Sequence, residues 1–155
     1  MILICGLGNP GKKYENTRHN VGFKLIEKLV KDYNFKKEKK DKSKEIFKGT
    51  IEKKNIFLVK PLLFMNMSGS PIKEIAKFYK IKNNNIFIIH DDLDINLGKI
   101  KFKTGGGNGG HKGLISIDTL IGKNYNRIRI GISRPQTKSL VNSYVLKKFN
   151  KNEQE

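Results

Sequence analysis

The chain has 155 residues and one cysteine, Cys5, which predicts a single domain, residues 1–155, and excludes an internal disulfide. No stretch approaches the ~18 apolar residues of a membrane helix and no signal-peptide pattern opens the chain, so we expect a cytoplasmic protein rather than a membrane protein. The formal net charge of +18, from 32 Lys and Arg against 14 Asp and Glu, favours a polyanionic partner, with nucleic acid first and an anionic membrane surface second. A coding bias toward Lys, Asn and Ile would also raise the charge.

The first strand is predicted at residues 2–7, and the turn residues GNPG follow it at 8–11. Residues 6–11 spell G-x-G-x-x-G, the fingerprint of a dinucleotide site. In such a site the helix begins inside the motif and directs its N-terminus at the pyrophosphate. Here Pro10 and the polar run 12–16 delay the helix to about Thr17, a candidate N-cap. We therefore interpret the glycines as a tight strand-to-loop turn rather than as a nicotinamide site.

The remaining elements alternate between helices and strands. Apolar residues at helical spacing predict a helix from about residue 17 to 34, and the charged run 35–45 predicts a solvated loop or an edge strand. Two strands that turn at 53–55 precede a helix that begins at Pro71. A buried strand at 85–90, a strand that leads into the glycines after 104, a helix at 112–121 and a strand at 127–132 complete the order. This alternation predicts an α/β fold with a mostly buried central sheet.

Four loops follow predicted strands, at 8–16, 61–69, 90–97 and 104–113, and α/β sheets form their sites outside the carboxyl ends of strands. His19 comes after the first loop at the start of a helix, where the helix N-terminus disfavours a charged ring and leaves it able to accept a proton. Its other nitrogen needs an acceptor, which the run HDDLD at 90–94 offers. We favour an Asp that orients His19, and a Mg²⁺ site at Asp91, Asp92 and Asp94 is the second interpretation.

Two other loops carry candidate binding groups. Asn66 lies between Met65 and Met67, which suggests an amide that binds a ligand within an apolar wall. The segment KTGGGNGGHKGL at 103–114 has five glycines in six successive positions, more than a turn requires. Backbone N–H groups exposed before a helix suit an anion or a nucleic-acid backbone, and a flexible lid or a tight hairpin turn is the structural alternative.

Five segments resemble bacterial-type peptidyl-tRNA hydrolases, in the same order and across nearly the whole chain: GLGNPGKKYENTRHNVGF, FMNMSG, HDDLD, GGGNGGHKGL and RIRIGISRP. The resemblance implies a mixed twisted sheet packed between helices. It also implies hydrolysis of the ester between a peptide and the 3′ end of its tRNA, by a monomer that needs no metal, organic cofactor or protein partner.

The resemblance further implies roles for individual residues. The catalytic group would consist of His19 as the base, Asp91 as its orienting acid, and Asn9. The substrate-binding group would consist of Tyr14 near the tRNA end, Met65 in the cleft wall, Asn66 and Lys112. The pair that holds a terminal phosphate of tRNA would consist of Lys103 and Arg129.

The chain departs from the family pattern at two places. Lys112 stands where the family commonly has Asn, and a lysine cannot accept a hydrogen bond but could contact phosphate or an oxyanion. We expect the family's further C-terminal helix to be short or absent in this chain. A non-catalytic RNA-binding protein on the same scaffold is the alternative function. The joint presence of His19, Asp91, Asn9 and Asn66 argues against it, because RNA binding requires no His–Asp pair.

Overall fold

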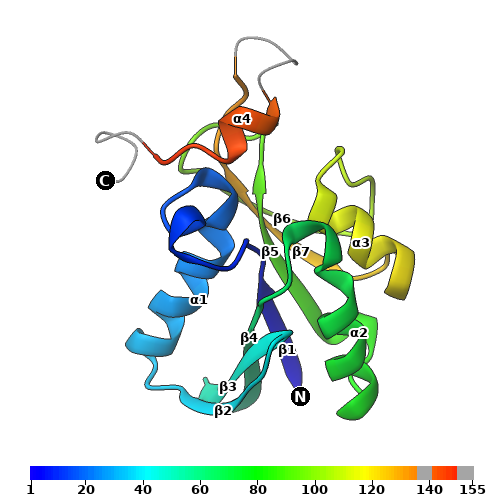
Figure 1. Ribbon diagram of the computed structural model, residues 1–155. Helices are drawn as coiled ribbons and strands as arrows, with labels where there is room; N and C mark the ends of the chain where they lie inside the picture. Colours follow the sequence, from blue (N-terminus) through cyan, green and yellow to red (C-terminus); the bar gives the residue numbers. More distant parts are fainter. Residues whose placement is uncertain (136–140, 150–155) are drawn as a thin grey trace.

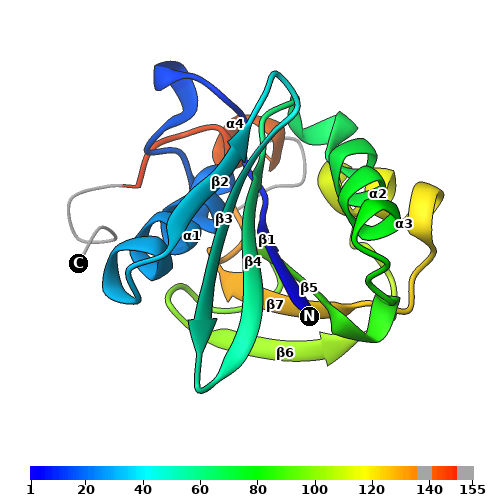
Figure 2. The same ribbon diagram turned by 90° about the horizontal axis from the view of Figure 1, so that it is seen from below.

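A computed structural model, which describes residues 1–135 and 141–149, contains one seven-stranded sheet in the order β2-β3-β4-β1-β5-β7-β6 (Figures 1 and 2). The strands are β1 (Ile2–Gly6), β2 (Lys36–Lys40), β3 (Lys44–Ile51), β4 (Lys54–Pro61), β5 (Ile86–Asp92), β6 (Ile100–Thr104) and β7 (Asn126–Gly131). The helices are α1 (Val21–Asp32), α2 (Gly69–Phe78), α3 (Lys112–Ile121) and α4 (Val141–Val145). The 3₁₀ turns are η1 (Lys12–Tyr14), η2 (Arg18–Asn20), η3 (Met65–Met67) and η4 (Asn83–Asn85). Among these helices, none has the length and hydropathy needed to span a bilayer.

The sheet is mixed. Strands β4, β1, β5 and β7 are parallel neighbours, whereas β2, β3 and β6 join it through antiparallel pairs. The most apolar sequences form its centre, where both faces are covered. All five residues of the charged strand β2 are exposed at one edge, and lysines on an edge strand oppose pairing with another chain. The α/β class with a mixed central sheet is confirmed, and the run 35–45 contains an edge strand.

Helices cover both faces of the sheet. Figures 1 and 2 show α1 on one face and α2 with α3 on the other. Ile26 of α1 packs in a buried cluster with Leu58 and Ile89, while Ile72 of α2 packs in a second cluster that includes Cys5. Each such side chain stabilises the fold by about 1.5–3 kcal/mol on burial. Burial raises the pKa of the Cys5 thiol, so this cysteine is a small apolar core residue.

The glycines of the first motif let α1 approach β1 closely. A Cβ atom on Gly6 would lie 2.2 Å from the carbonyl oxygen of Gly22, and a Cβ atom on Gly22 would lie 2.5 Å from the amide nitrogen of Leu7. A Cβ atom on Gly8 would meet the ring of Phe23 at 2.7 Å. Gly11, with a φ of 99°, is the member of the motif with left-handed backbone. Gly6 and Gly8 of the motif, and Gly22 of α1, are therefore needed for helix–strand packing or ring contact rather than for the turn.

Three element boundaries differ from the prediction. The helix expected from Thr17 begins as the 3₁₀ turn η2, and the Thr17 hydroxyl donates to the carbonyl of Tyr14 at 2.8 Å instead of capping the helix. Pro71 is the third residue of α2, not the first. Strands β3 and β4 turn at Glu52 and Lys53 rather than at 53–55. The φ values of these two residues are 50° and 67°, and two successive left-handed residues match the twist of the strands that flank a two-residue hairpin loop.

The parallel strands bring the loops after β1, β4 and β5 to one edge of the sheet. Strand β6 is antiparallel to β7, and Thr104 at its end pairs with Asn126 at the start of β7. The glycine-rich segment therefore starts at the opposite edge and runs back to His111. Its path is held by Arg127, which donates hydrogen bonds to the carbonyl oxygens of Gly106 and Gly107. The sequence predicts that this fourth loop, like the other three, follows a strand that ends at the common edge. That prediction is wrong, because β6 runs in the opposite direction.

Candidate active site

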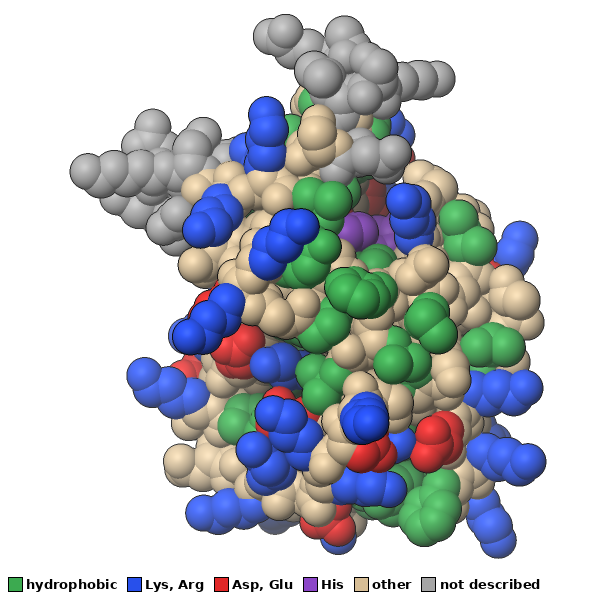
Figure 3. Space-filling model, viewed as in Figure 1, with side chains coloured by type: hydrophobic (Ala, Val, Ile, Leu, Met, Phe, Trp, Pro, Cys, Tyr) green, Lys and Arg blue, Asp and Glu red, His purple; other side chains and the backbone are tan. Residues whose placement is uncertain are grey.

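A cleft of about 760 Å³ opens where the parallel strands end. Figure 3 shows histidine side chains at the floor of a hollow, with basic side chains on both sides and apolar side chains below it. Eight of the nine predicted site residues line this cleft: Asn9, His19, Met65, Asn66, Asp91, Lys103, Lys112 and Arg129. Tyr14 is not among the lining residues; its ring stands edge-on to Phe64, which does line the cleft, at a centroid distance of 6.2 Å.

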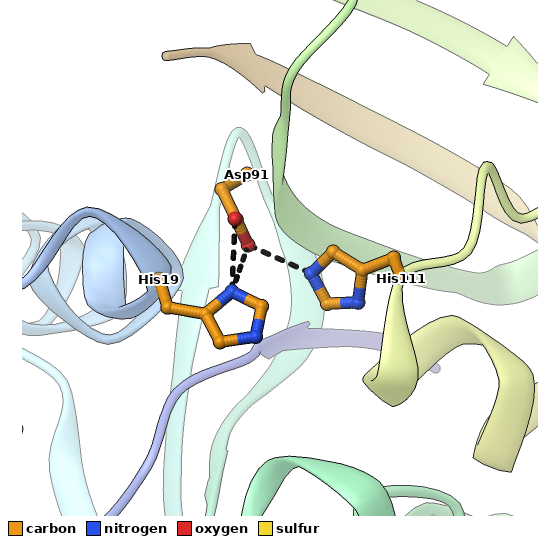
Figure 4. Close-up of side chains that lie close together, drawn as sticks. All are labelled: His19, Asp91 and His111. Atoms are coloured by element: carbon orange, nitrogen blue, oxygen red, sulfur yellow. Dashed lines mark hydrogen bonds and ion pairs between the residues drawn. The ribbon is translucent and has the colours of Figure 1, made fainter. Parts of the chain in front are cut away.

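His19 and Asp91 form a buried pair. Nδ1 of His19 in η2 is 2.9 Å from Oδ1 and 2.8 Å from Oδ2 of Asp91 in β5 (Figure 4). An ionised carboxylate only accepts hydrogen bonds, so Nδ1 carries the proton and Nε2 keeps its lone pair. The ring lines the cleft, and its second nitrogen is therefore available as a proton acceptor.

A second histidine contacts the same carboxylate. Nε2 of His111 is 2.7 Å from Oδ1 of Asp91 (Figure 4). Burial disfavours the charged carboxylate, but the two histidine rings outweigh burial and hold the pKa of Asp91 well below its usual range. Asp91 is therefore ionised at neutral pH. The sequence reasoning did not single out His111, although its place directly before a predicted helix and after a glycine run was a usable signal.

A third histidine, His90, lies behind this group. Burial and then the ring of His111 lower the pKa of His90 to about 4, so it is uncharged at neutral pH. Its Nδ1–H donates to the carbonyl oxygen of Asp91 at 2.8 Å, and Nε2 is buried without a hydrogen-bond partner in the described structure. His90 thus contributes an uncharged ring to the wall of the cleft.

The amide of Asn9 is held from two directions. Its Oδ1 accepts a hydrogen bond from the backbone N–H of Met65 at 2.7 Å, which leaves Nδ2 as the donor end. Its backbone N–H and C=O each bond to the side chain of Asn20 at 2.8 Å. Asn20 links the loop after β1 to η2, which carries His19, and the sequence reasoning missed it. The conformation of Asn9 is therefore tied to both η2 and η3.

The other predicted substrate-binding residues differ in burial. Met65 is buried in the cleft wall, whereas Asn66 is exposed beside it in η3 and Met67 is exposed and not among the lining residues. Lys112 is the first residue of α3 and also lines a smaller hollow with Asn66. The apolar wall therefore involves Met65 and not Met67.

The two predicted phosphate-binding residues are in different electrostatic states. Nε of Arg129 is 2.8 Å from Oδ2 of Asp92, so an acidic partner already offsets part of its charge. Among the described residues, no carboxylate lies within ion-pair distance of Lys103, which lines the cleft from β6. Lys103 is therefore the cation of the two that is more available to an anionic ligand.

The three carboxylates of the HDDLD run do not converge on one point. Asp91 faces two histidines, Asp92 pairs with Arg129, and Asp94 pairs with Arg134 at 2.6 Å. This arrangement does not fit a Mg²⁺ site built from carboxylates. In the described chain, possible ligand atoms of three residues come within 4.8 Å of one another at His19, Asp91 and His111, but hydrogen bonds already join these atoms.

Comparisons with known proteins identify the family of this chain. The family model described as peptidyl-tRNA hydrolase matches residues 3–155. The chain is 51% identical over its full length to the peptidyl-tRNA hydrolase of Rickettsia canadensis and 53% identical to that of Rickettsia conorii, and it covers 84% of each. A crystal structure of peptidyl-tRNA hydrolase from Acinetobacter baumannii superimposes with a TM-score of 0.94 at 44% identity, over 99% of this chain and 79% of that one. From the motifs, the fold and these matches together, the chain belongs to the peptidyl-tRNA hydrolase family.

Proposed function

We propose that this protein hydrolyses the ester bond between a peptide, or an N-blocked amino acid, and the 3′ end of a tRNA. The observation that carries the proposal is the His19 ring in the cleft, with Nδ1 bound to the buried carboxylate of Asp91 at 2.8 Å. Ester hydrolysis requires a base that activates water and donors that stabilise the developing oxyanion. The cleft offers both.

In this reaction Nε2 of His19 takes a proton from a water molecule while the water oxygen bonds to the ester carbonyl carbon. Asp91 stabilises the protonated ring and holds its orientation. The donor end of the Asn9 amide, fixed by its bond to Met65, and the exposed amide of Asn66 are available to the ester and the peptide. When the tetrahedral intermediate collapses, the proton on Nε2 passes to the departing ribose oxygen of the tRNA.

The tRNA is proposed to lie against the basic side of the cleft. Lys103, Arg129 and Lys112 all line it, and phosphate contacts of this kind position a nucleic acid without reading its sequence. Tyr14, edge-on to Phe64, would lie near the tRNA end. We propose a monomer acting in the cytoplasm, with one hydrolase domain in residues 1–155. The expectation about the C-terminal helix falls on residues outside the described part of the chain, which omits 136–140 and 150–155.

Release of an N-acetylated amino acid from its tRNA tests the activity directly. We expect release with and without EDTA, because the proposed base is an imidazole rather than a metal-bound water. No release under either condition would refute the enzyme and favour the RNA-binding alternative. Release that EDTA abolishes would revive a metal-dependent mechanism.

Removal of the base tests the mechanism. The change His19→Ala should lower kcat at least ~100-fold, since general base catalysis contributes about 10²–10⁴-fold, while affinity for tRNA persists. The matched control is Lys31→Ala, an exposed position on α1 away from the cleft. Single-turnover kinetics and a tRNA-binding titration measure the two effects. Equal activity of the His19 variant and the control would remove His19 from the mechanism.

A further inference from the structure

His111 connects the catalytic carboxylate to a helix end. It is the N-cap residue of α3, and its ring lies between Asp91 and the first turn of that helix. Nε2 is 2.7 Å from Oδ1 of Asp91, while Nδ1 accepts hydrogen bonds from the backbone N–H of Gly113 at 3.1 Å and of Leu114 at 3.3 Å. Both ring nitrogens are thus engaged, on opposite sides of the ring.

These contacts determine which nitrogen carries the proton. Backbone N–H groups only donate, so Nδ1 must present its lone pair, and the single proton of the ring then lies on Nε2. That N–H points at the Asp91 carboxylate, which accepts it. A proton on Nδ1 would displace both backbone N–H groups and would place positive charge at a helix N-terminus, where the helix dipole opposes it.

We propose that His111 is a positioning residue for the His19–Asp91 pair. The backbone N–H groups at the N-terminus of α3 keep Nδ1 of His111 unprotonated, so the ring proton lies on Nε2 and points at Asp91. Of the two rings, His19 is then the one that accepts a proton in the reaction. Two histidines contact one carboxylate, and the hydrogen-bond pattern distinguishes their roles. His19 keeps a free nitrogen toward the cleft, whereas His111 uses its second nitrogen to cap a helix.

The surroundings of His111 are consistent with this division of roles. The ring centroid of His19 lies 4.8 Å away and that of His90, whose burial leaves it uncharged at neutral pH, lies 5.4 Å away. The one carboxylate in contact with the ring is Asp91, among the residues that the structure describes. The other charged side chains around the cleft are Asp92, Asp94, Lys103, Lys112, Arg127 and Arg129.

Two substitutions separate the two sides of the ring. In His111→Asn the side-chain oxygen takes the place of Nδ1 and still caps α3, since Asn is a favoured N-cap residue, but the donor to Asp91 is lost. In His111→Gln the amide nitrogen takes the place of Nε2 and keeps a donor toward Asp91. The pair therefore tests the contact with Asp91 while a capping or donating group remains in each variant.

We expect His111→Asn to lower kcat by about tenfold, the effect of losing one hydrogen bond to a charged group. It should also move the acidic limb of the kcat/KM profile up by about one pH unit, because an Asp91 carboxylate with one donor fewer stabilises the protonated His19 ring more strongly. His111→Gln should return the limb to its wild-type position and recover part of kcat. The proposal would be overturned if the acidic limb of the kcat/KM profile stayed in place in both His111→Asn and His111→Gln, or if it shifted equally in both.

The position of the proton on the His111 ring can also be measured without substrate. Long-range ¹H–¹⁵N correlation spectra of the histidine rings should show Nδ1 of His111 as the unprotonated nitrogen and Nε2 as the protonated one, and the opposite pattern would overturn the proposal. The kinetic arm depends on the proposed hydrolase function, whereas the spectrum does not. If tRNA ester hydrolysis fails while the spectrum shows this tautomer, the proposed function is wrong and the tautomer assignment stands.

Discussion

Asn20 shows how much of this site depends on a residue that does not line the cleft. It is fully buried and satisfies the backbone N–H and C=O of Asn9, two polar groups in a loop without regular structure. An unpaired buried polar group is costly, because it has lost its water without gaining a partner. Asn20 therefore holds the loop in the conformation that presents the amide of Asn9 to the cleft.

The change Asn20→Ala should destabilise the protein by about 3 kcal/mol, since it leaves two buried backbone groups without partners at about 1–3 kcal/mol each. It should also lower kcat, because the amide of Asn9 is no longer held in place. Urea unfolding measures the stability, and Asn55→Ala, at an exposed position in β4, is the control. A loss of stability equal to that of the control would show that Asn9 does not depend on this side chain.

At the scale of elements, the position of His19 depends on how closely α1 approaches the sheet. Gly22 in the first turn of α1 lies against the backbone at the end of β1, and η2 with His19 directly precedes this turn. Asp91 is on β5, the neighbour of β1. The distance between the side chains of His19 and Asp91 is therefore set by the contact of Gly22 with backbone atoms, which the absence of a side chain at residue 22 permits.

The change Gly22→Ala tests this contact. The added Cβ would lie 2.5 Å from the amide nitrogen of Leu7, so α1 must move away from β1, and overpacking of this kind costs about 1–3 kcal/mol. We expect a lower midpoint of thermal unfolding together with a reduced kcat, because η2 moves with the helix.

The control for this change is Gly107→Ala. Gly107 does not have a left-handed φ, and a Cβ atom there would meet no atom within 4 Å. Its unfolding midpoint should stay close to that of the wild type. If Gly22→Ala were as stable as this control, the close approach of α1 to β1 would not depend on the absence of a side chain at residue 22.

At the scale of the whole molecule, the net charge of +18 produces a general attraction for polyanions. Local contacts must therefore be separated from this general attraction. The two edge strands make the comparison possible, since β6 borders the cleft and β2 forms the far edge of the same sheet. Lysines on both strands are exposed.

The change Lys103→Ala should weaken tRNA binding and reduce the slope of log affinity against log salt by about one, the effect expected for one lost phosphate contact. The change Lys40→Ala, on β2, removes the same charge at the far edge and should leave the slope nearly unaltered. Binding titrations at several salt concentrations measure both. Equal slopes for the two variants would place the phosphate contact elsewhere on the molecule.

The sequence by itself determined the α/β order, the buried strands β1 and β5 and the limits of α3, and its motifs pointed to nine site residues, of which eight line the cleft. Hydrophobic periodicity and turn residues act over a few neighbouring positions, so these features can be read locally. The direction of β6, the contact between Gly6 and Gly22, and the convergence of His111 on Asp91 arise between segments far apart in the chain. Only the tertiary structure decided them, because the register of distant strands and the capping of α3 depend on packing that no single segment encodes.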